Sequence, residues 1–328
     1  MNSEYVDFSR WAPRSAMYWA LRPQKAARRL LAEAVPLAVR VRPSGDPALA
    51  GRGTLTWWSY DRGQLGDKLH LTFPSTARVT NLDARWRVIA RAIWRMVRKD
   101  PGMVFHEVAV DLEDGATPGL PESVFAFARL RGAGNALLPN PYLLRDRDVG
   151  KPRAWEAKKD TLYFRGADSG AITLEANTRV VLCRLAKDLP RTSCLLTRLV
   201  QGTPEAHAQM RQEGLVGKRI PIPDMNKYRF LVDADGNTTS WDRYMLIGAY
   251  GSVPILFEPA WEECWHGDLV DGENCVLADR HTLGPLLERL RADDAYARKI
   301  AAGASRLVAT RLSPEGVQAL FEAAWKAR

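Results

Sequence analysis

The chain has 328 residues, and its composition of 46% hydrophobic and 26% charged residues is ordinary for a globular protein with room for two domains. It contains no low-complexity tract and no internal repeat, and because no stretch of about eighteen apolar residues occurs, the sequence predicts no membrane-spanning helix. The net charge of +9 comes from the first 100 residues, which hold 18 basic and 8 acidic side chains, whereas the rest of the chain has a net charge of −1.

The N-terminal residues show no basic segment followed by an apolar run, so we expect no secretory signal. The expected location is the cytoplasm, and peripheral attachment to the inner face of the membrane is a further possibility. The four cysteines lack metal-site spacing, which predicts reduced, buried thiols, and a bridge between Cys264 and Cys275 is the alternative. The five histidines show no metal spacing either. The cysteines are Cys183, Cys194, Cys264 and Cys275.

The basic excess gathers on two predicted amphipathic helices in the first third of the chain. These charges are either solvated, or they bind an anionic membrane surface or an anionic glycolipid or polysaccharide acceptor. A nucleic-acid partner is not expected, because no recognition motif accompanies the charge. The basic residues are Arg22, Lys25, Arg28 and Arg29 in the first helix, and Arg85, Arg87, Arg91, Arg95, Arg98 and Lys99 in the second.

Short strands separated by glycine and proline are predicted in the first half at Leu37–Arg42, Thr54–Trp58, Leu69–Phe73, Val104–Leu112 and Ser123–Leu130. The fourth of these strands ends in the acidic sequence Asp111-Leu-Glu-Asp114-Gly. This sequence is either a solvated turn, or it places a general base at the carboxyl end of a strand.

An irregular, proline-containing connection that ends near Pro152 predicts a domain boundary, so the N-terminal domain is expected at residues 1–152. Strands and helices then alternate, which predicts an α/β domain with a parallel sheet at residues 153–310. A last helix within 311–328 is expected to cross back to the first domain. The predicted elements are Thr161–Phe164, Thr173–Ala186, Cys194–Val200, Pro204–Glu213, Leu283–Ala292, Asp294–Thr310 and Pro314–Lys326.

The stretch from Lys227 to Pro259 predicts a βαβ unit at the centre of this domain. Tyr228–Val232 and Val253–Phe257 are short apolar runs that suit buried strands. Between them, a polar segment with Gly236 precedes a predicted helix that begins at Thr239 or Ser240. The polar segment therefore lies at the carboxyl end of a strand, where open α/β sheets bind ligands.

A helix beginning at Ser240 would direct free backbone N–H groups and the positive end of its dipole at a ligand, and a phosphate suits that position. Arg243 in the first turn disfavours the helix but favours a bound anion. A capped helix with a solvated arginine is the alternative.

Two sequence blocks resemble glycosyltransferase family 90, the Rumi-like, capsule-associated and lipopolysaccharide-modifying family. The first is Lys227-Tyr-x-Phe-x-Val-Asp-x-Asp-Gly-Asn-Thr-x-Ser-Trp241, followed by Gly251-Ser-Val-Pro-Ile-Leu256. The second is Trp155-x-x-Lys158, followed by Leu-Tyr-Phe-Arg165-Gly-Ala167. The segment from Phe257 to Glu262 is similar more loosely. Two ordered blocks are more specific than either alone.

This resemblance implies an α/β, GT-B-like fold of two Rossmann-like domains facing a central cleft, and an inverting, metal-independent transfer of sugar. A nucleotide sugar, expected to be a UDP-sugar, would be the donor, and a surface glycan or lipopolysaccharide, free or lipid-linked, would be the acceptor. The family's catalytic aspartate best matches Asp114, which lies 51 residues before Arg165, and Asp111 is the rival. The implied donor-binding residues are Arg165, Gly166, Asp235, Gly236, Asn237, Ser240, Trp241, Arg243 and Glu258.

Two other interpretations use the same residues. Asp233-Ala-Asp235 also matches the Asp-x-Asp pattern with which GT-A glycosyltransferases hold a divalent ion against the diphosphate. The neighbouring Gly236 and Asn237 and the block at Arg165 favour the family 90 interpretation, so no metal or other cofactor is expected. A non-catalytic basic protein that binds membranes or polysaccharides is the alternative from another class.

Overall fold

The computed structural model describes residues 6–7, 35–42, 54–74, 79–116, 118–145 and 149–327. They form two compact units. The first consists of Met1–Phe127, Gly134–Leu137 and Phe321–Arg328, and the second consists of Ala128–Ala133 and Leu138–Leu320. The chain thus enters the second unit near residue 138, before the boundary expected at 152, and the last eight residues are part of the first unit.

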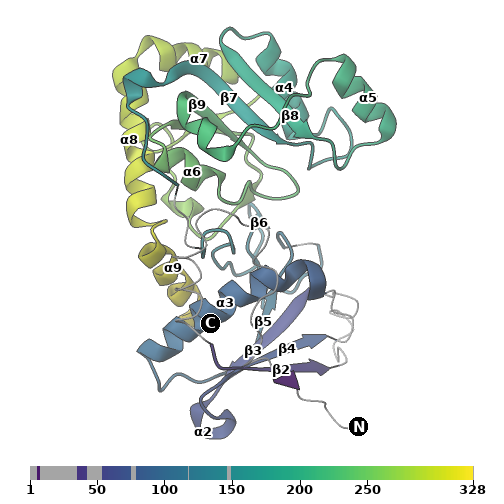
Figure 1. The fold of residues 1–328 in the computed structure, drawn as a ribbon, viewed down its shortest axis with the longest axis vertical. Coiled ribbons are helices and arrows are strands. Elements are labelled where there is room, and N and C mark those ends of the chain that lie inside the picture. Colours follow the sequence, from purple (N-terminus) through teal and green to yellow (C-terminus); the bar gives the residue numbers. More distant parts are fainter. Residues whose placement is uncertain are drawn as a thin grey trace. The chain divides into compact units, whose positions relative to one another are not determined.

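The first unit contains a five-stranded sheet in the order β1-β2-β4-β3-β5 (Figure 1). Only β2 and β4 pair in parallel; β3 runs antiparallel to both β4 and β5. The sheet is therefore mixed rather than Rossmann-like, because the connection from β3 to β4 is too short for a parallel crossover. The strands are β1 (Val6–Asp7), β2 (Leu37–Arg42), β3 (Leu55–Tyr60), β4 (Leu69–Pro74) and β5 (Phe105–Asp111), and α2 (Arg62–Leu65) joins β3 to β4.

Helix α3 (Val79–Lys99) of the first unit is amphipathic, as the sequence predicts. Its apolar side is buried through Ile89, Ile93 and Val97, while Arg98 and Lys99 are exposed. Trp325, from the last turns of the chain, stacks on Phe125 with ring centroids 5.6 Å apart and completes this core. The basic residues at 22–29 lie outside the described residues.

The second unit is an α/β unit with a five-stranded parallel sheet in the order β12-β10-β9-β7-β8 (Figure 1), which confirms the predicted fold class. The strands are β7 (Lys159–Ala167), β8 (Thr192–Arg198), β9 (Tyr228–Ala234), β10 (Val253–Phe257) and β12 (Val276–Ala278). The helices are α4 (Thr178–Lys187), α5 (Pro204–Gln212), α6 (Arg243–Ala249), α7 (Leu283–Ala292), α8 (Asp294–Thr310) and α9 (Pro314–Lys326), with 3₁₀ turns η2 (Trp155–Ala157), η3 (Ile222–Lys227) and η4 (His266–Asp268). The last turns of α9 belong to the first unit.

This sheet is doubly wound. Helices α4 and α7 pack with Phe164 and Val232 on one face, and α6 packs with Tyr163 and Leu231 on the other. From β7 the chain continues through α4 to the outer strand β8, whereas from β9 it continues through α6 in the opposite direction to β10. The topological switch point therefore lies between β7 and β9, and in open α/β sheets ligands bind outside the carboxyl ends of the strands at such a point.

Two local predictions change in the structure. The strand predicted at Ser123–Leu130 is reduced to β6 (Arg129–Leu130), which pairs with β11 (Trp261–Glu262), and Phe125 and Ala126 form only isolated bridges. All four cysteines are free, so the alternative bridge between Cys264 and Cys275 is absent.

Within the described part of the chain, no helix is long and apolar enough to cross a bilayer.

Candidate functional site

The two blocks that resemble family 90 meet at the switch point. The block that ends at Ala167 forms η2 and β7, and the block from Lys227 to Leu256 forms β9, α6 and β10. Strands β7 and β9 are adjacent and parallel, with Leu162 opposite Phe230 and Tyr163 opposite Leu231. Segments far apart in the sequence thus place their polar ends at one edge of one sheet.

The segment after β9 differs from the prediction. Helix α6 begins at Arg243, three residues later than predicted, and has seven residues. Trp241 has φ of 60°, in the left-handed region, so a helix cannot continue through it. The Ser240 hydroxyl donates to the carbonyl of Ala234 at 2.7 Å instead of capping the helix. The prediction that a helix begins at Ser240 is therefore wrong, and donor binding by Ser240 stays a prediction.

Backbone strain marks two loops at the carboxyl edge of the sheet. Trp241 follows β9, and Glu258, with φ of 46°, follows β10. A left-handed conformation costs a non-glycine residue roughly 1–2 kcal/mol, and such residues cluster at functional sites. Glu258 forms a two-point ion pair with Arg280, at 2.8 and 3.0 Å. Asp235 joins the two loops, because its Oδ2 accepts the N–H groups of Ala260 and Trp261 at 2.8 and 3.0 Å.

The structure directs Arg165 away from this edge. Its guanidinium donates to the Ser193 carbonyl at 2.5 Å and to the Ser193 hydroxyl at 2.9 Å, and it lies 4.8 Å from the centre of the Tyr163 ring. The backbone carbonyl of Arg165 accepts a hydrogen bond from Arg243 at 2.9 Å. Arg165 therefore contributes its carbonyl to the edge, and its side chain joins β7 to β8.

Arg243 and Asp233 are two half-buried charged residues beneath the edge on the α6 side. Burial lowers the pKa of Arg243, although Asp233 opposes this, and burial raises the pKa of Asp233, although Arg243 opposes this. Two buried polar atoms of these residues have no hydrogen-bond partner among the described residues: Arg243 Nε and Asp233 Oδ1. Because such atoms are rare in native proteins, this pair indicates a functional constraint on the edge.

Arg179, which the sequence analysis does not single out, lies at the switch point itself. It is 7% exposed, and it donates to the carbonyls of Ala167 and Ala234, the last residues of β7 and β9, at 3.3 and 3.1 Å. It also donates to the hydroxyls of Ser169 at 2.6 Å and Ser240 at 3.3 Å. Burial and then Arg243 lower its pKa to about 10, so it stays charged at neutral pH.

Three predicted donor-binding residues serve close backbone packing. A Cβ on Gly236 would lie 2.7 Å from Ser169 Oγ and 2.8 Å from Arg179 Nη2, so only glycine fits there without movement. A Cβ on Gly166 would lie 2.7 Å from the ring of Phe164, which excludes a larger residue in the same way. Asn237 is exposed, and its Oδ1 accepts the N–H of Gly170 at 3.0 Å, which joins the loops after β7 and β9.

A second residue that the sequence analysis missed is Glu263, which is 3% exposed. It accepts hydrogen bonds from the hydroxyl of Thr239 at 2.6 Å, the amide of Asn140 at 2.5 Å and the indole of Trp265 at 3.0 Å. Burial raises the pKa of Glu263 to about 7 despite these donors. Since Asn140 also donates to the Trp241 carbonyl at 3.3 Å, Glu263 fixes the loop that contains the strained residue.

The acidic turn lies in the first unit, after β5. Asp111 is 1% exposed, and its Oδ1 accepts the Thr54 hydroxyl at 2.7 Å and the Glu113 N–H at 3.1 Å. The Asp114 side chain is 37% exposed, and Arg85 of α3 donates to its Oδ1 at 2.6 Å. Asp111 thus stabilises the turn, whereas Asp114 is partly open to solvent and held in one position by a cation.

The carboxylates of the Asp-x-Asp pattern have protein partners. Asp235 accepts two backbone N–H groups, and burial, followed by Asp233, raises its pKa to about 6. Across the residues that the structure describes, no group of three or more His, Cys, Asp and Glu side chains is arranged to hold a metal ion.

No protein-family model matches the chain, and the curated proteins contain no match to it. Among solved structures, about half of the chain is similar to the C-terminal domain of a glycosyl transferase group 1 family protein, LpcC, from Francisella tularensis. The identity is 18%, the match covers 49% of this chain and 94% of that domain, and the TM-score is 0.35.

Two further similar structures are Anabaena HepE, solved with UDP and glucose, and sucrose-phosphate synthase from Thermosynechococcus elongatus. HepE has 13% identity over 52% of this chain and 49% of its own, with a TM-score of 0.38. The synthase has 12% identity over 55% of this chain and 49% of its own, with a TM-score of 0.38. The match thus spans about half the length of these two proteins.

Proposed function

We propose that the chain is a glycosyltransferase that moves a sugar from a nucleotide-sugar donor to a hydroxyl group of a glycan. The observation that carries this proposal is the meeting of the two family 90 blocks on β7 and β9, at the switch point of a doubly wound parallel sheet. The buried guanidinium of Arg179 and the half-buried guanidinium of Arg243, whose Nε is unpaired, suit an anionic ligand such as a diphosphate.

The donor is assigned to the carboxyl edge of the second unit. Arg179 and Arg243 supply positive charge beside Ser240 and Gly236, where a leaving diphosphate would gain negative charge. Following the resemblance, we propose a UDP-sugar, whose hexose or pentose is selected by the shape of the site. Glu258 and Asn237 belong to the loops that would surround the nucleotide.

Asp114 is the proposed general base. It would remove the proton from the acceptor hydroxyl while that oxygen attacks the anomeric carbon opposite the departing diphosphate, so the anomer inverts. The ion pair with Arg85 supports this role by fixing the carboxylate, and its partial exposure leaves an oxygen available to a substrate. The rival, Asp111, is buried and already accepts two hydrogen bonds.

Metal independence is part of the proposal. The Oδ2 atom of Asp235 is engaged by Ala260 and Trp261, and the diphosphate charge would be offset by arginines instead of a divalent ion. Activity that survives excess chelator would support this, and activity that requires added Mg²⁺ or Mn²⁺ would favour the metal-dependent interpretation. The acceptor class, a surface glycan or lipopolysaccharide made on the cytoplasmic side of a membrane, follows from the resemblance alone.

The first test measures donor binding without an acceptor. A panel of sugar nucleotides is screened by thermal shift, since a bound ligand raises the melting temperature by mass action, and UDP is then titrated by calorimetry. Arg243→Ala should weaken UDP binding at least tenfold, because one charge-assisted contact is lost. Arg211→Ala, an exposed residue of the same unit, serves as the control. If no nucleotide sugar stabilises the chain, the proposal fails.

The second test separates chemistry from binding. Asp114→Asn should lower transfer and donor hydrolysis by about 10²–10⁴-fold while UDP binding stays unchanged, because a positioned base contributes about that much. Asp100→Asn removes another exposed carboxylate from the same unit and should leave the rate unchanged. A near-normal rate for Asp114→Asn would rule out this residue and direct attention to Asp111. Absence of any hydrolysis or transfer in the wild type would favour the non-catalytic alternative.

A further inference from the structure

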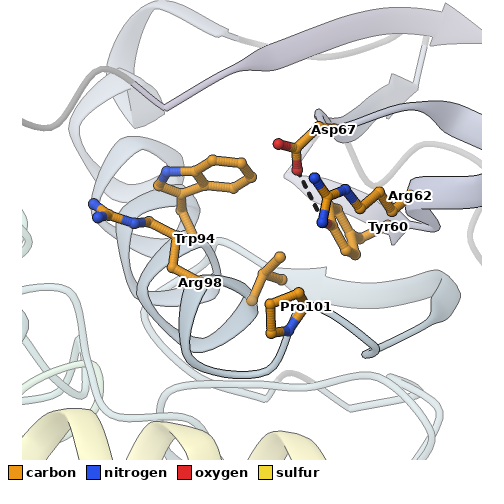
Figure 2. Close-up of a pocket in the computed structure, with 7 residues that line it drawn as sticks. Tyr60, Arg62, Asp67, Trp94, Arg98 and Pro101 are labelled. Carbon is orange, nitrogen blue, oxygen red and sulfur yellow. Dashed lines mark hydrogen bonds between the residues drawn. The ribbon is translucent and has the colours of Figure 1, made fainter.

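A cavity of about 320 Å³ lies within the first unit, between the end of β3, α2 and the last turns of α3. Figure 2 shows Tyr60, Arg62 and Asp67 on one side and Trp94 with Arg98 on the other. This volume is at the lower end of the range for small-molecule pockets, so it suits a ligand of one ring.

Local structure fixes one wall of the cavity. The carboxylate of Asp61 accepts the N–H groups of Gly63 and Gln64 at 2.9 and 3.0 Å and so caps α2, which begins at Arg62. The hydroxyl of Tyr60 donates to Asp67 Oδ1 at 3.0 Å, and the Tyr60 side chain is 1% exposed. The wall is therefore pre-formed and does not need to be ordered by a ligand.

Helical spacing builds the other wall. Trp94 lies three residues before Val97 and four before Arg98, so these side chains share one side of α3 near its end, and Pro101 follows just after the helix. Trp94 is half-buried, and its ring meets Tyr60 edge to face, at 6.4 Å between centroids. An indole with one free surface offers a flat apolar face beside polar groups.

The charges of the cavity favour an anion. Arg62 and Arg98 are exposed, and neither guanidinium has a hydrogen-bond or ion-pair partner among the described residues. Asp67, the acidic residue of the lining, already accepts the Tyr60 hydroxyl. The lining thus has a net positive charge, and guanidinium groups bind carboxylates and phosphates in two-point geometry.

We propose that this cavity binds an anionic sugar unit, a uronate or a sugar phosphate, with its ring on the Trp94 indole and its anion on Arg62 and Arg98. If the proposed transfer reaction holds, the unit belongs to the acceptor glycan. Arg98, one of the basic residues predicted on this helix, would then hold the acceptor at a point away from the reacting end.

Helix α3 sets the distance between this cavity and the proposed base. Arg85, which holds Asp114, precedes Trp94 by nine residues and Arg98 by thirteen, which corresponds to roughly 14–20 Å along a helix. The pairing of β3 with β5 agrees, because Tyr60 lies opposite Phe105 and Leu55 lies opposite Asp111 at the far end. One sugar ring cannot span that distance, so the cavity would hold a unit several residues from the reacting hydroxyl.

The test measures binding to the full chain without a donor. Saturation-transfer NMR and calorimetry are used with glucuronate, a hexose phosphate, uncharged methyl glucoside and inorganic phosphate. Arg62→Gln, and more so Arg62→Gln with Arg98→Gln, should weaken the two anionic sugars at least tenfold, and Trp94→Ala should remove the advantage of the sugars over phosphate. Arg211→Gln makes the same change on an exposed arginine of the second unit and should have no effect.

Several results would overturn the proposal. Unchanged sugar binding in the Arg62 and Arg98 variants would do so, as would inorganic phosphate binding as tightly as the hexose phosphate. Binding to vesicles of anionic phospholipid but not to the sugars would instead show a membrane surface. Melting temperatures equal to that of the wild type would establish that the variants fold. UDP binding is measured separately, so a failure here is distinct from a failure of the proposed transferase activity.

Discussion

Replacing Arg179 with methionine tests whether the switch point depends on one buried guanidinium. The change keeps an unbranched side chain of similar reach but removes four hydrogen bonds, to Ala167, Ala234, Ser169 and Ser240. It also leaves the carboxylate of Asp233 with less opposing charge.

The expected loss follows from these contacts. The bond to Ser169 at 2.6 Å is short and charge-assisted, the bond to Ala234 at 3.1 Å is ordinary, and the two at 3.3 Å are weaker. At about 1 kcal/mol for each bond, offset in part by the desolvation cost that disappears with the charge, the free energy of unfolding should fall by about 2–4 kcal/mol. For a unit of this size that corresponds to a decrease in melting temperature of roughly 10 °C.

The assay must report on the second unit, because a chain with two units need not unfold in one step. Hydrogen exchange at the amides of β7, β9 and α4 measures the opening of this unit directly. Arg184→Met on the same helix is the control, because Arg184 forms a partly exposed, two-point ion pair with Glu213 that should contribute only about 1 kcal/mol. If Arg179→Met costs no more than Arg184→Met, the assignment of Arg179 as the central support of the switch point is wrong.

Two further predictions concern buried carboxylates. Burial raises the pKa of Glu263 from 4.5 to about 7, so its stabilising contribution is full below about pH 4.5 and is lost as the pH rises through 7. In the Glu263→Gln variant, the free energy of unfolding should therefore depend less on pH between 5 and 8. An unchanged pH profile would contradict this. Asp168 is also buried; desolvation raises its pKa, but hydrogen bonds from the N–H groups of residues 200–202 and from His207 outweigh this and hold its pKa below 3.8. Its stabilising contribution is therefore present above pH 3.8 and lost at lower pH. Asp168→Asn should lower the free energy of unfolding by about 2–3 kcal/mol at neutral pH, and its decrease towards acidic pH, measured by urea denaturation at a series of pH values, should be smaller than in the wild type. A decrease as steep as that of the wild type would refute this role.

Apolar periodicity sufficed to predict most elements of the second unit. The strand Val253–Phe257 and the helices at 283–292, 294–310 and 314–326 occur with the predicted bounds. These elements are specified by local patterns: a continuous apolar run for a buried strand, and apolar residues at helical spacing for a helix. The first unit was harder, because whether β3 and β4 pair in parallel depends on the connection between them and not on the composition of either strand.

The candidate site shows where local patterns fail. Serine is a residue type that often caps helices, which leads to the prediction at Ser240. Trp241, however, has a backbone conformation in the left-handed region, which no sequence pattern predicts for a tryptophan. Arg179 follows Asn177, the residue that caps α4, in the first turn of an amphipathic helix, where an arginine is ordinarily solvated. Its burial depends on carbonyl groups at the ends of two strands that are adjacent only in the folded sheet.

The free-energy cost of the residues at the switch point indicates a functional role and not a purely structural one. Arginine and aspartate are expensive to bury, and apolar residues of similar volume often stabilise a core as well or better. Here the buried Arg179 lies beside Arg243 and Asp233, which are partly exposed but each hold one buried, unpaired atom, and beside a strained Trp241. A sheet selected for stability alone would not need this combination. Because each feature is unfavourable for folding and all of them lie at the edge where parallel sheets bind ligands, they support the anionic donor proposed above.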